Sequence, residues 1–276
     1  MSLGAVEAIA PLHRGTYGSP RYPLPSEQSR LSPRDTPDIP DWIRNFRDTR
    51  EPARFLNVFD EDEFPPAWRL HDAERPALLA NESMYGRWSD ARVLILARDA
   101  GTKWNFIPVI QGGRGFSWVH DEARPTNRNL RPYADSMKCS KLYGSAMSCL
   151  VLNSPKPSDG SKAKERVKLR PLLDERCRQF VSRVLRWTLE HTPQLELVIC
   201  LGEDSWDLTM NAFDIAVPPF AAVRGRAPRS YLPDRPRVRF GVVGHTGNHF
   251  DAGKRPVEWA PFLEAAAAMK PAPAHH

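Results

Sequence analysis

Four short apolar runs recur along the chain, and each is bounded by polar residues, Gly or Pro. Runs of this length and composition are typical of strands buried on both faces of a sheet. Helical patterns lie between and around them, most clearly over 172–190, where apolar side chains recur at helical spacing among charged residues. The predicted strands are 92–97, 148–152, 195–201 and 238–243. The apolar positions of the 172–190 helix are Leu173, Cys177, Phe180, Val181, Val184, Leu185 and Leu189.

Strands that alternate with helices predict an α/β fold with right-handed crossovers. We expect a three-layer α/β/α sandwich around a four-stranded parallel sheet. Further helices are expected over 70–85, ahead of the first strand, and over 260–270, at the end of the domain. Residues 1–41 form a Pro-rich, loosely ordered arm in this interpretation, residues 42–270 a single domain, and residues 271–276 a tail.

Composition narrows the function classes. The chain of 276 residues is 41% hydrophobic and carries a net charge of +6, which is compatible with a polyanionic partner. Its four cysteines form no C-x-x-C pair, which suggests neither a zinc ribbon nor an iron–sulfur site. The function favoured below needs no metal and no organic cofactor. No apolar segment is long enough to span a bilayer. We therefore expect a cytoplasmic monomer with no membrane partner.

Polar residues follow three of the predicted strands. Asp99 comes shortly after the first, Asn153 directly after the second and His245 shortly after the fourth. The carboxyl ends of parallel strands share one edge of a sheet, so these residues can meet in one pocket. Each residue alone is also an ordinary turn former or surface residue. Their joint occurrence favours a site. A Gly-rich loop over 112–118 brings aromatic side chains that can clamp a flat ring.

Taken in order, five segments resemble the motifs of the uracil-DNA glycosylase superfamily. That family has an acidic or amide residue after its first strand, an aromatic loop, an Asn after the second strand, a helix-capping Gly after the third, and a His-containing motif after the fourth. The resemblance covers about residues 88–255, and it rests on order and spacing. The segments are 94–99 (LILARD), 115–117 (GFS), 150–153 (LVLN), 198–202 (VICLG) and 243–247 (VGHTG).

The resemblance implies a repair enzyme that hydrolyses the N-glycosidic bond of uracil in DNA and leaves an abasic site. Asp99 would orient water and stabilise the positively charged sugar, and His245 would donate a hydrogen bond to the departing base. Asn153 would read one edge of uracil with its amide, and Phe116 would stack on the extruded ring. Arg98 and Gly101 flank the acid and complete the predicted base-binding set.

The resemblance also implies a DNA-binding surface after the fourth strand. A wedge must fill the space that the extruded base leaves, and His249 or Phe250 is placed to do so. Basic side chains near the pocket would neutralise phosphates. The predicted DNA-binding residues are Thr246, Gly247, Asn248, His249, Lys254, Arg255 and Lys156.

Departures from the family pattern bear on substrate range. Gly101 stands where the family commonly has a Tyr that closes the pocket against a substituent at carbon five of the base. We therefore expect tolerance of 5-substituted uracils. Two other readings stay open: a sensor that grips uracil or abasic sites in DNA with little or no turnover, and a Rossmann-like enzyme acting on a small molecule.

Overall fold

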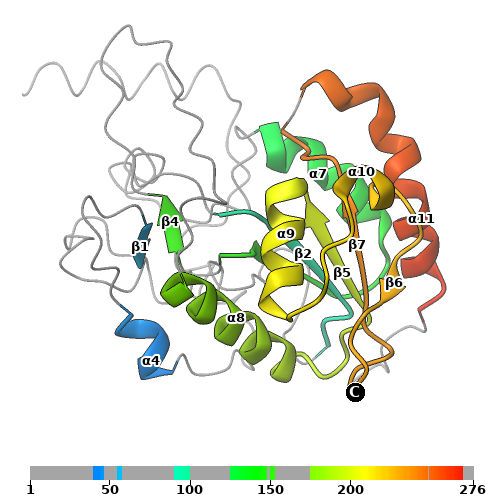
Figure 1. Cartoon of the computed structure of the whole chain (residues 1–276). Coiled ribbons are helices and arrows are strands. Elements are labelled where there is room, and N and C mark those ends of the chain that lie inside the picture. The colour runs from blue at the N-terminus through cyan, green and yellow to red at the C-terminus, as the bar shows by residue number, and fades with distance from the viewer. Residues whose placement is uncertain are drawn as a thin grey trace, which may run out of the picture.

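A five-stranded sheet forms the centre of the structure (Figure 1). The computed structural model describes residues 40–46, 55–57, 90–99, 125–147, 150–152, 175–247 and 249–269. The strands of this sheet are, in spatial order, β3 (Lys141–Ser145), β2 (Val93–Ala97), β5 (Leu197–Leu201), β7 (Arg239–Val243) and β6 (Arg229–Ser230). The first four run parallel, whereas β6 is antiparallel to β7 at the edge.

Burial explains why these segments form the sheet. Every residue of β2 and of β5 is buried, as the near-continuous apolar sequences VLILA and LVICL require. The register aligns Leu96 with Cys200 and Cys200 with Val242. The carboxyl ends of β2, β5 and β7 therefore lie level with one another, and the residues that follow them emerge at one edge of the sheet.

Helices cover both faces of this sheet (Figure 1). Cys200 faces α9 (Glu203–Ala212), because its Sγ lies 3.4 Å from Thr209 Oγ1. The preceding residue of β5, Ile199, is aligned with Gly241, against which Phe262 of α11 (Arg255–Ala267) packs. Because successive side chains of a strand point to opposite faces, α9 and α11 lie on opposite sides of the sheet.

The helix predicted over 172–190 is found as α8 (Glu175–Glu190). Its apolar positions from Cys177 to Leu189 are buried, and it packs beside α9, where the Ser182 hydroxyl donates a hydrogen bond to the carbonyl of Ala212. The closing helix α11 begins at Arg255, five residues ahead of the predicted 260–270 span, because η4 (His249–Lys254) leads directly into it.

A second, two-stranded sheet lies apart from the first. It pairs β1 (Phe55–Asn57) with β4 (Leu150–Leu152) in antiparallel register. The Asn57 amide donates a hydrogen bond to the carbonyl of Ile43 at 2.7 Å, which ties β1 to the short helix α4 (Asp41–Arg44). Next to α4, Phe46 stacks on Phe180 of α8 with 3.9 Å between ring centroids. Phe46 thus attaches the α4 segment to α8, and β1 is tied to that segment through Asn57.

The mixed α/β class is confirmed, but the predicted four-stranded, all-parallel sheet is wrong. The predicted strand over 148–152 contributes β4 to the small sheet, and β3 occupies the place beside β2. The sequence of β3, KLYGS, carries too little aliphatic surface to read as a buried strand, yet all five of its residues are buried. Burial lowers the pKa of Lys141, which is consistent with an ammonium group in a poorly hydrated position.

Other predicted elements lie outside the described residues. These are the 70–85 helix, nearly all of the 1–41 arm and the 271–276 tail. Among the residues that the structure does describe, no helix is both long and apolar enough to cross a membrane. Helix α7 (Pro125–Ser136), which was not predicted, lies beside α11 and reaches the carboxyl edge of the sheet.

Candidate functional site

Charged side chains from three elements meet at the carboxyl edge of the sheet. Arg98 and Asp99 follow β2, Asp204 lies in the first turn of α9 after β5, and His245 follows β7. The charges of Arg98, Asp99 and Asp204 all act on the His245 ring. We call these four residues the strand-end cluster. The structure thus brings together the two predicted catalytic residues, Asp99 and His245, which are 146 positions apart in the sequence.

Arg98 links the two carboxylates of this cluster. Its Nε pairs with Asp99, and its Nη1 lies 3.3 Å from Oδ2 of Asp204. The Asp99 side chain is only 4% exposed, whereas that of Asp204 is 46% exposed. Burial disfavours the charged guanidinium, but Asp99 and then Asp204 more than offset this, so the pKa of Arg98 is raised above its ordinary value. Arg98 is therefore a permanent cation and cannot act as an acid.

Gly202 makes room for His245 in the middle of the cluster. It caps the N-terminus of α9 with φ +89°, a left-handed conformation that favours glycine. A Cβ built on Gly202 would lie 3.2 Å from Cβ of His245 and 3.8 Å from Cδ2 of its ring. The histidine from β7 therefore lies against the end of β5, on the side of Asp99 and Asp204. The helix-capping Gly expected after the third strand is found at this position.

The His245 ring is held in one tautomer. The backbone N–H of Gly247 donates to Nδ1 at 3.2 Å, so Nδ1 is an acceptor and the proton of the neutral ring lies on Nε2. Partial burial of the ring, and then the positive charge of Arg98, lower the pKa of His245 below its ordinary value, although Asp99 and Asp204 oppose this shift. His245 as a residue is nevertheless exposed, so part of it is accessible to a ligand.

Helix α7 holds the loop that carries His245. Asn129 Nδ2 donates to the carbonyl of Thr246 at 2.8 Å, and the Thr246 hydroxyl donates to the carbonyl of Thr126 at 3.0 Å. Thr246 is completely buried. Its side chain, predicted to bind DNA, instead bonds inward and fixes the loop.

The remaining predicted DNA-binding residues divide into two groups. Lys254 is exposed at the end of η4, as a phosphate contact requires. Arg255 is 8% exposed, and its charge acts on His245 and Tyr133, so it is part of the protein interior. Gly247 is half-buried and serves the His245 ring through its N–H.

Several predicted site residues lie outside the described residues. They are Gly101, Phe116, Asn153, Lys156 and Asn248, together with the side chains of His249 and Phe250. The base-reading role of Asn153 and the stacking role of Phe116 therefore remain predictions.

A groove of about 790 Å³ lies along α9, away from His245. It shares only Asp204 with the strand-end cluster, and its other walls come from α8, α9 and 217–221. Its acidic residues Glu203, Asp204 and Asp207 make it a poor binding site for a polyanion. Over the described residues, no group of three or more His, Cys, Asp or Glu is arranged to hold a metal ion.

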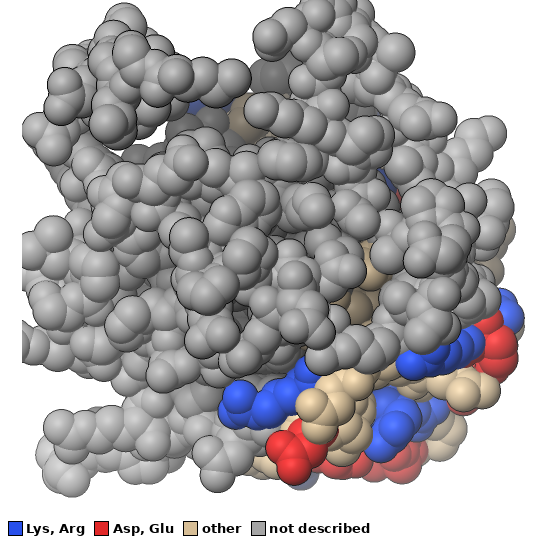
Figure 2. Space-filling model, turned by 90° about the vertical axis from the view of Figure 1, so that its left-hand side faces the viewer, with Lys and Arg blue, Asp and Glu red and all other residues tan. Residues whose placement is uncertain are grey.

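The arginines of α8 do not form a free basic surface. Arg178 pairs with Glu175 at 2.7 Å, Arg186 pairs with Asp214 at 3.1 Å, and the Arg183 guanidinium lies 4.1 Å from the ring centroid of Trp42. On the face shown in Figure 2, basic side chains are interspersed with acidic ones among the residues that are described. This face offers no continuous positive patch over its described part.

Sequence reasoning missed Asp204 and the contacts from α7. Asp204 is the second residue of a helix capped by Gly202, where the helix dipole favours acidic residues, so its sequence context has a purely structural explanation. Asn129 and Thr126 precede β3 and lie in a segment with no predicted element. Their role depends on how α7 crosses the sheet edge.

Comparison of the chain with models of known protein families and with curated proteins found no match.

Proposed function

We propose that the chain is a DNA glycosylase that hydrolyses the N-glycosidic bond of uracil in DNA and leaves an abasic site. One observation carries the proposal: a buried carboxylate, Asp99, and a neutral histidine donor, His245, lie at the same edge of a parallel sheet, where the end of the intervening strand β5 presents the side-chain-free Gly202 to His245. Cleavage of a glycosidic bond develops opposite charges on sugar and base, so it requires both groups.

His245 is suited to the departing base. As a uracil leaves, negative charge develops on its ring oxygens, and a preorganised N–H donor stabilises that charge most in a poorly hydrated site. The Gly247 N–H holds Nδ1 as an acceptor, so Nε2–H is the group available to the base. The lowered pKa keeps the ring neutral at physiological pH, and the ring stabilises the base by donating a hydrogen bond without first taking up a proton.

Asp99 is suited to the sugar. Its side chain is almost completely buried, so its negative charge is weakly screened and acts strongly on a nearby oxocarbenium-like sugar. The adjoining Arg98 neutralises part of that charge in the free protein. We therefore expect a slower enzyme than one whose carboxylate has no cationic partner.

Base selection is assigned to three residues outside the described part of the chain. In this proposal Asn153 reads the Watson–Crick edge of uracil, Phe116 stacks on its ring, and Gly101 leaves space at carbon five. Lys254, exposed beyond the His245 loop, supplies one phosphate contact. If Gly101→Tyr and the wild type both reject 5-substituted uracils equally, the assignment of Gly101 fails.

A base-release assay tests the proposal. Duplex and single-stranded oligonucleotides with one uracil are incubated with protein and then treated with hot alkali, which cleaves the strand only at abasic sites. We expect strand scission with the wild type and about 100-fold less with Asp99→Asn. Asp135→Asn, an exposed aspartate on α7, is the matched control and should match the wild type.

A second function, a lesion sensor without turnover, is favoured by one specific observation. The Arg98–Asp99 ion pair occupies the carboxylate that hydrolysis needs. In the same assay, a sensor would shift uracil-containing DNA on a gel and leave the strand intact after alkali. This alternative is rejected if the wild type causes strand scission and Asp99→Asn does so much more slowly.

A further inference from the structure

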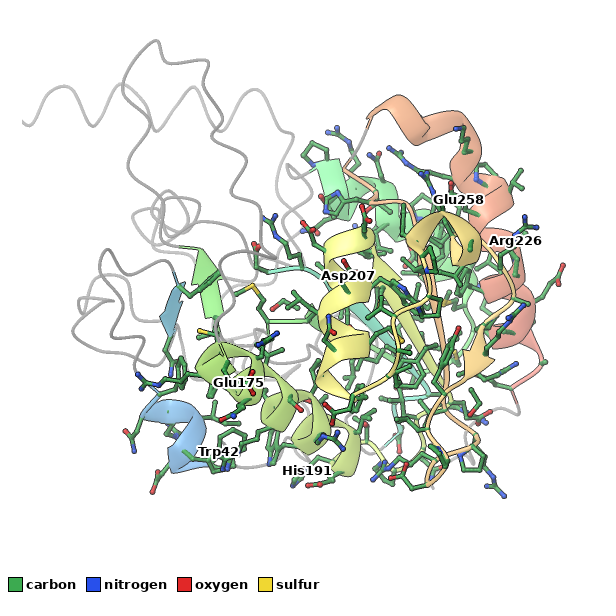
Figure 3. The ribbon with its side chains drawn as sticks, in the orientation of Figure 1. Trp42, Glu175, His191, Asp207, Arg226 and Glu258 are labelled. Atoms are coloured by element: carbon green, nitrogen blue, oxygen red, sulfur yellow. The ribbon has the colours of Figure 1, made fainter. Side chains whose placement is uncertain are left out.

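We infer that Glu258 and Arg224 are positioning residues for His245: together they fix the backbone of Gly244 and so aim the histidine at the site. This inference rests on the proposed function for its kinetic test, but its structural test does not. Glu258 comes from α11, and Arg224 follows α10 (Phe220–Val223). Figure 3 shows Glu258 beside α10.

Both carboxylate oxygens of Glu258 are engaged. Oε2 accepts a hydrogen bond from the Gly244 N–H at 2.8 Å, and Oε1 lies 2.6 Å from Nη2 of Arg224. The Glu258 side chain is 11% exposed and that of Arg224 is 22% exposed, so water competes little for either group. Hydrogen bonds to an ionised acceptor are stronger than neutral ones. The residue immediately before His245 is therefore held by a charge-assisted bond.

Gly244 packs so closely against these two side chains that a Cβ would not fit without movement of a neighbour. A Cβ built on this residue would lie 2.5 Å from Nη2 of Arg224 and 3.0 Å from Oε2 of Glu258. Backbone pairing also fixes Arg224, because it forms an isolated parallel bridge with Val242 of β7 and the following Gly225 N–H donates to the Val242 carbonyl at 2.8 Å. The carboxylate of Glu258 on α11 thus binds both Arg224, which follows α10, and Gly244, which follows β7 and precedes His245 in the sequence.

The consequence is a two-sided clamp on the His245 loop. Glu258 fixes the residue before His245, and Gly247, held near α7 through its neighbour Thr246, fixes the Nδ1 atom after it. If Gly244 moves, the His245 ring shifts relative to the Gly247 N–H, and its Nε2–H donor no longer points into the site. Displacement of a catalytic group by about 1 Å can cost about 100-fold in rate.

The structural test reads the His245 ring directly. Protein labelled with ¹⁵N at histidine gives the tautomer and the titration of His245 by NMR, with the resonances assigned from a His245→Ala sample. The test variant is Glu258→Gln, whose amide cannot satisfy both the Gly244 N–H and Arg224. Glu264→Gln, an exposed position on the same helix, is the matched control.

We expect wild type and Glu264→Gln to hold the Nε2–H tautomer, and Glu258→Gln to populate both tautomers. The double variant Arg224→Met/Glu258→Gln removes both charges, so it leaves no unpaired ion if the single variant fails to fold, and it is expected to show the same mixture of tautomers. If the folded variants keep the wild-type tautomer and titration, the positioning role is wrong.

The kinetic test is a double-mutant cycle on uracil release. Glu258→Gln is expected to lower the single-turnover rate about tenfold in the wild-type background, with the affinity for a non-cleavable uracil analogue in DNA unchanged. In a His245→Ala background the same change should cost less than about twofold, because the residue it acts through is gone. Equal losses in both backgrounds contradict the inference. If the wild type releases no base, the proposed function fails, and the NMR comparison alone decides the positioning role.

Discussion

The ends of β2 and β7 support the two halves of the candidate site in different ways. At the end of β7, His245 sits in a loop held by several directed hydrogen bonds: neutral ones from Gly247 and Asn129, and the charge-assisted one between Gly244 and Glu258. At the end of β2, Asp99 is held by an ion pair with Arg98, which reaches on to the half-exposed Asp204. Several hydrogen bonds from different elements fix the orientation of a loop, whereas a partly exposed ion pair holds its flexible side chains less firmly. The β7 side of the site is therefore the more rigid one and the β2 side the more adjustable one.

Lowering the pH should disrupt the β7 side of the site first, through protonation of His245. The folded pKa of His245 lies below its unfolded value of about 6.5, so the stability that this group contributes is fully present above that value. This stability is lost as the pH falls through the folded pKa, because a protonated Nδ1 cannot accept the hydrogen bond from the Gly247 N–H. Below that pKa the rate of base release should fall about tenfold per pH unit.

The control for this prediction is His245→Gln, which has no titrating ring. Its free energy of unfolding, measured by urea denaturation between pH 7.5 and pH 5, should lack the part of the pH dependence that His245 gives the wild type. Identical pH profiles for the two proteins would show that His245 does not titrate as described.

Gly202→Ala should disturb the packing of His245 against the end of β5, which lies between the β2 and β7 sides of the site. The new Cβ would lie 3.2 Å from Cβ of His245, and alanine disfavours φ +89°, which costs about 1–2 kcal/mol. We expect about tenfold slower base release together with a lower urea midpoint. Gly253→Ala is the matched control, since a Cβ there has nothing within 4 Å. Equal behaviour of the two variants would contradict the role of Gly202.

The sequence predicted the parts of this site that depend on local pattern. Asp99, Gly202 and His245 each follow a strand that its apolar run identifies, and parallel strands place their ends together. The partners of these residues depend on packing between distant segments. Nothing near Asn129 or Asp204 in the sequence indicates that they meet residues 117 and 106 positions away.

The strand β3 shows the same limit for the fold. Lys141 at its start and Gly144 near its end conceal a strand whose residues are nevertheless all buried. The sequence pattern predicts that the more apolar run at 148–152 belongs to the main sheet. Such a pattern shows how apolar a segment is, but it does not show which strand the segment pairs with. Pairing is decided by the whole chain, and here β1 takes β4 out of the main sheet.

Thr246→Val should weaken the β7 side without a dependence on salt. Removal of the buried hydroxyl leaves the Thr126 carbonyl without that donor, at a cost of about 1–3 kcal/mol in the free energy of unfolding. The loss should be the same at 50 mM and 500 mM salt in urea denaturation. Ser136→Ala, which removes an exposed hydroxyl, should cost far less. A loss that depends on salt would argue against a neutral bond.

Asp204→Asn should have the smallest effect and should depend on salt. The Arg98–Asp204 pair spans 3.3 Å with both side chains substantially exposed, so its loss should cost no more than about 1 kcal/mol. The difference in unfolding free energy from the wild type should shrink as salt rises from 50 mM to 500 mM. A loss as large as that of Thr246→Val would show that the β2 side is as rigid as the β7 side.

The most direct test of the account is the single-turnover release of uracil from DNA by the wild type, Asp99→Asn, His245→Ala and the variant with both changes. Because the two groups act on opposite ends of one bond in one transition state, each single change should slow release about 100-fold or more, and the combined variant should lose much less than the product of the two. Release by Asp99→Asn at the wild-type rate would contradict the central claim that this carboxylate and this histidine act as one site.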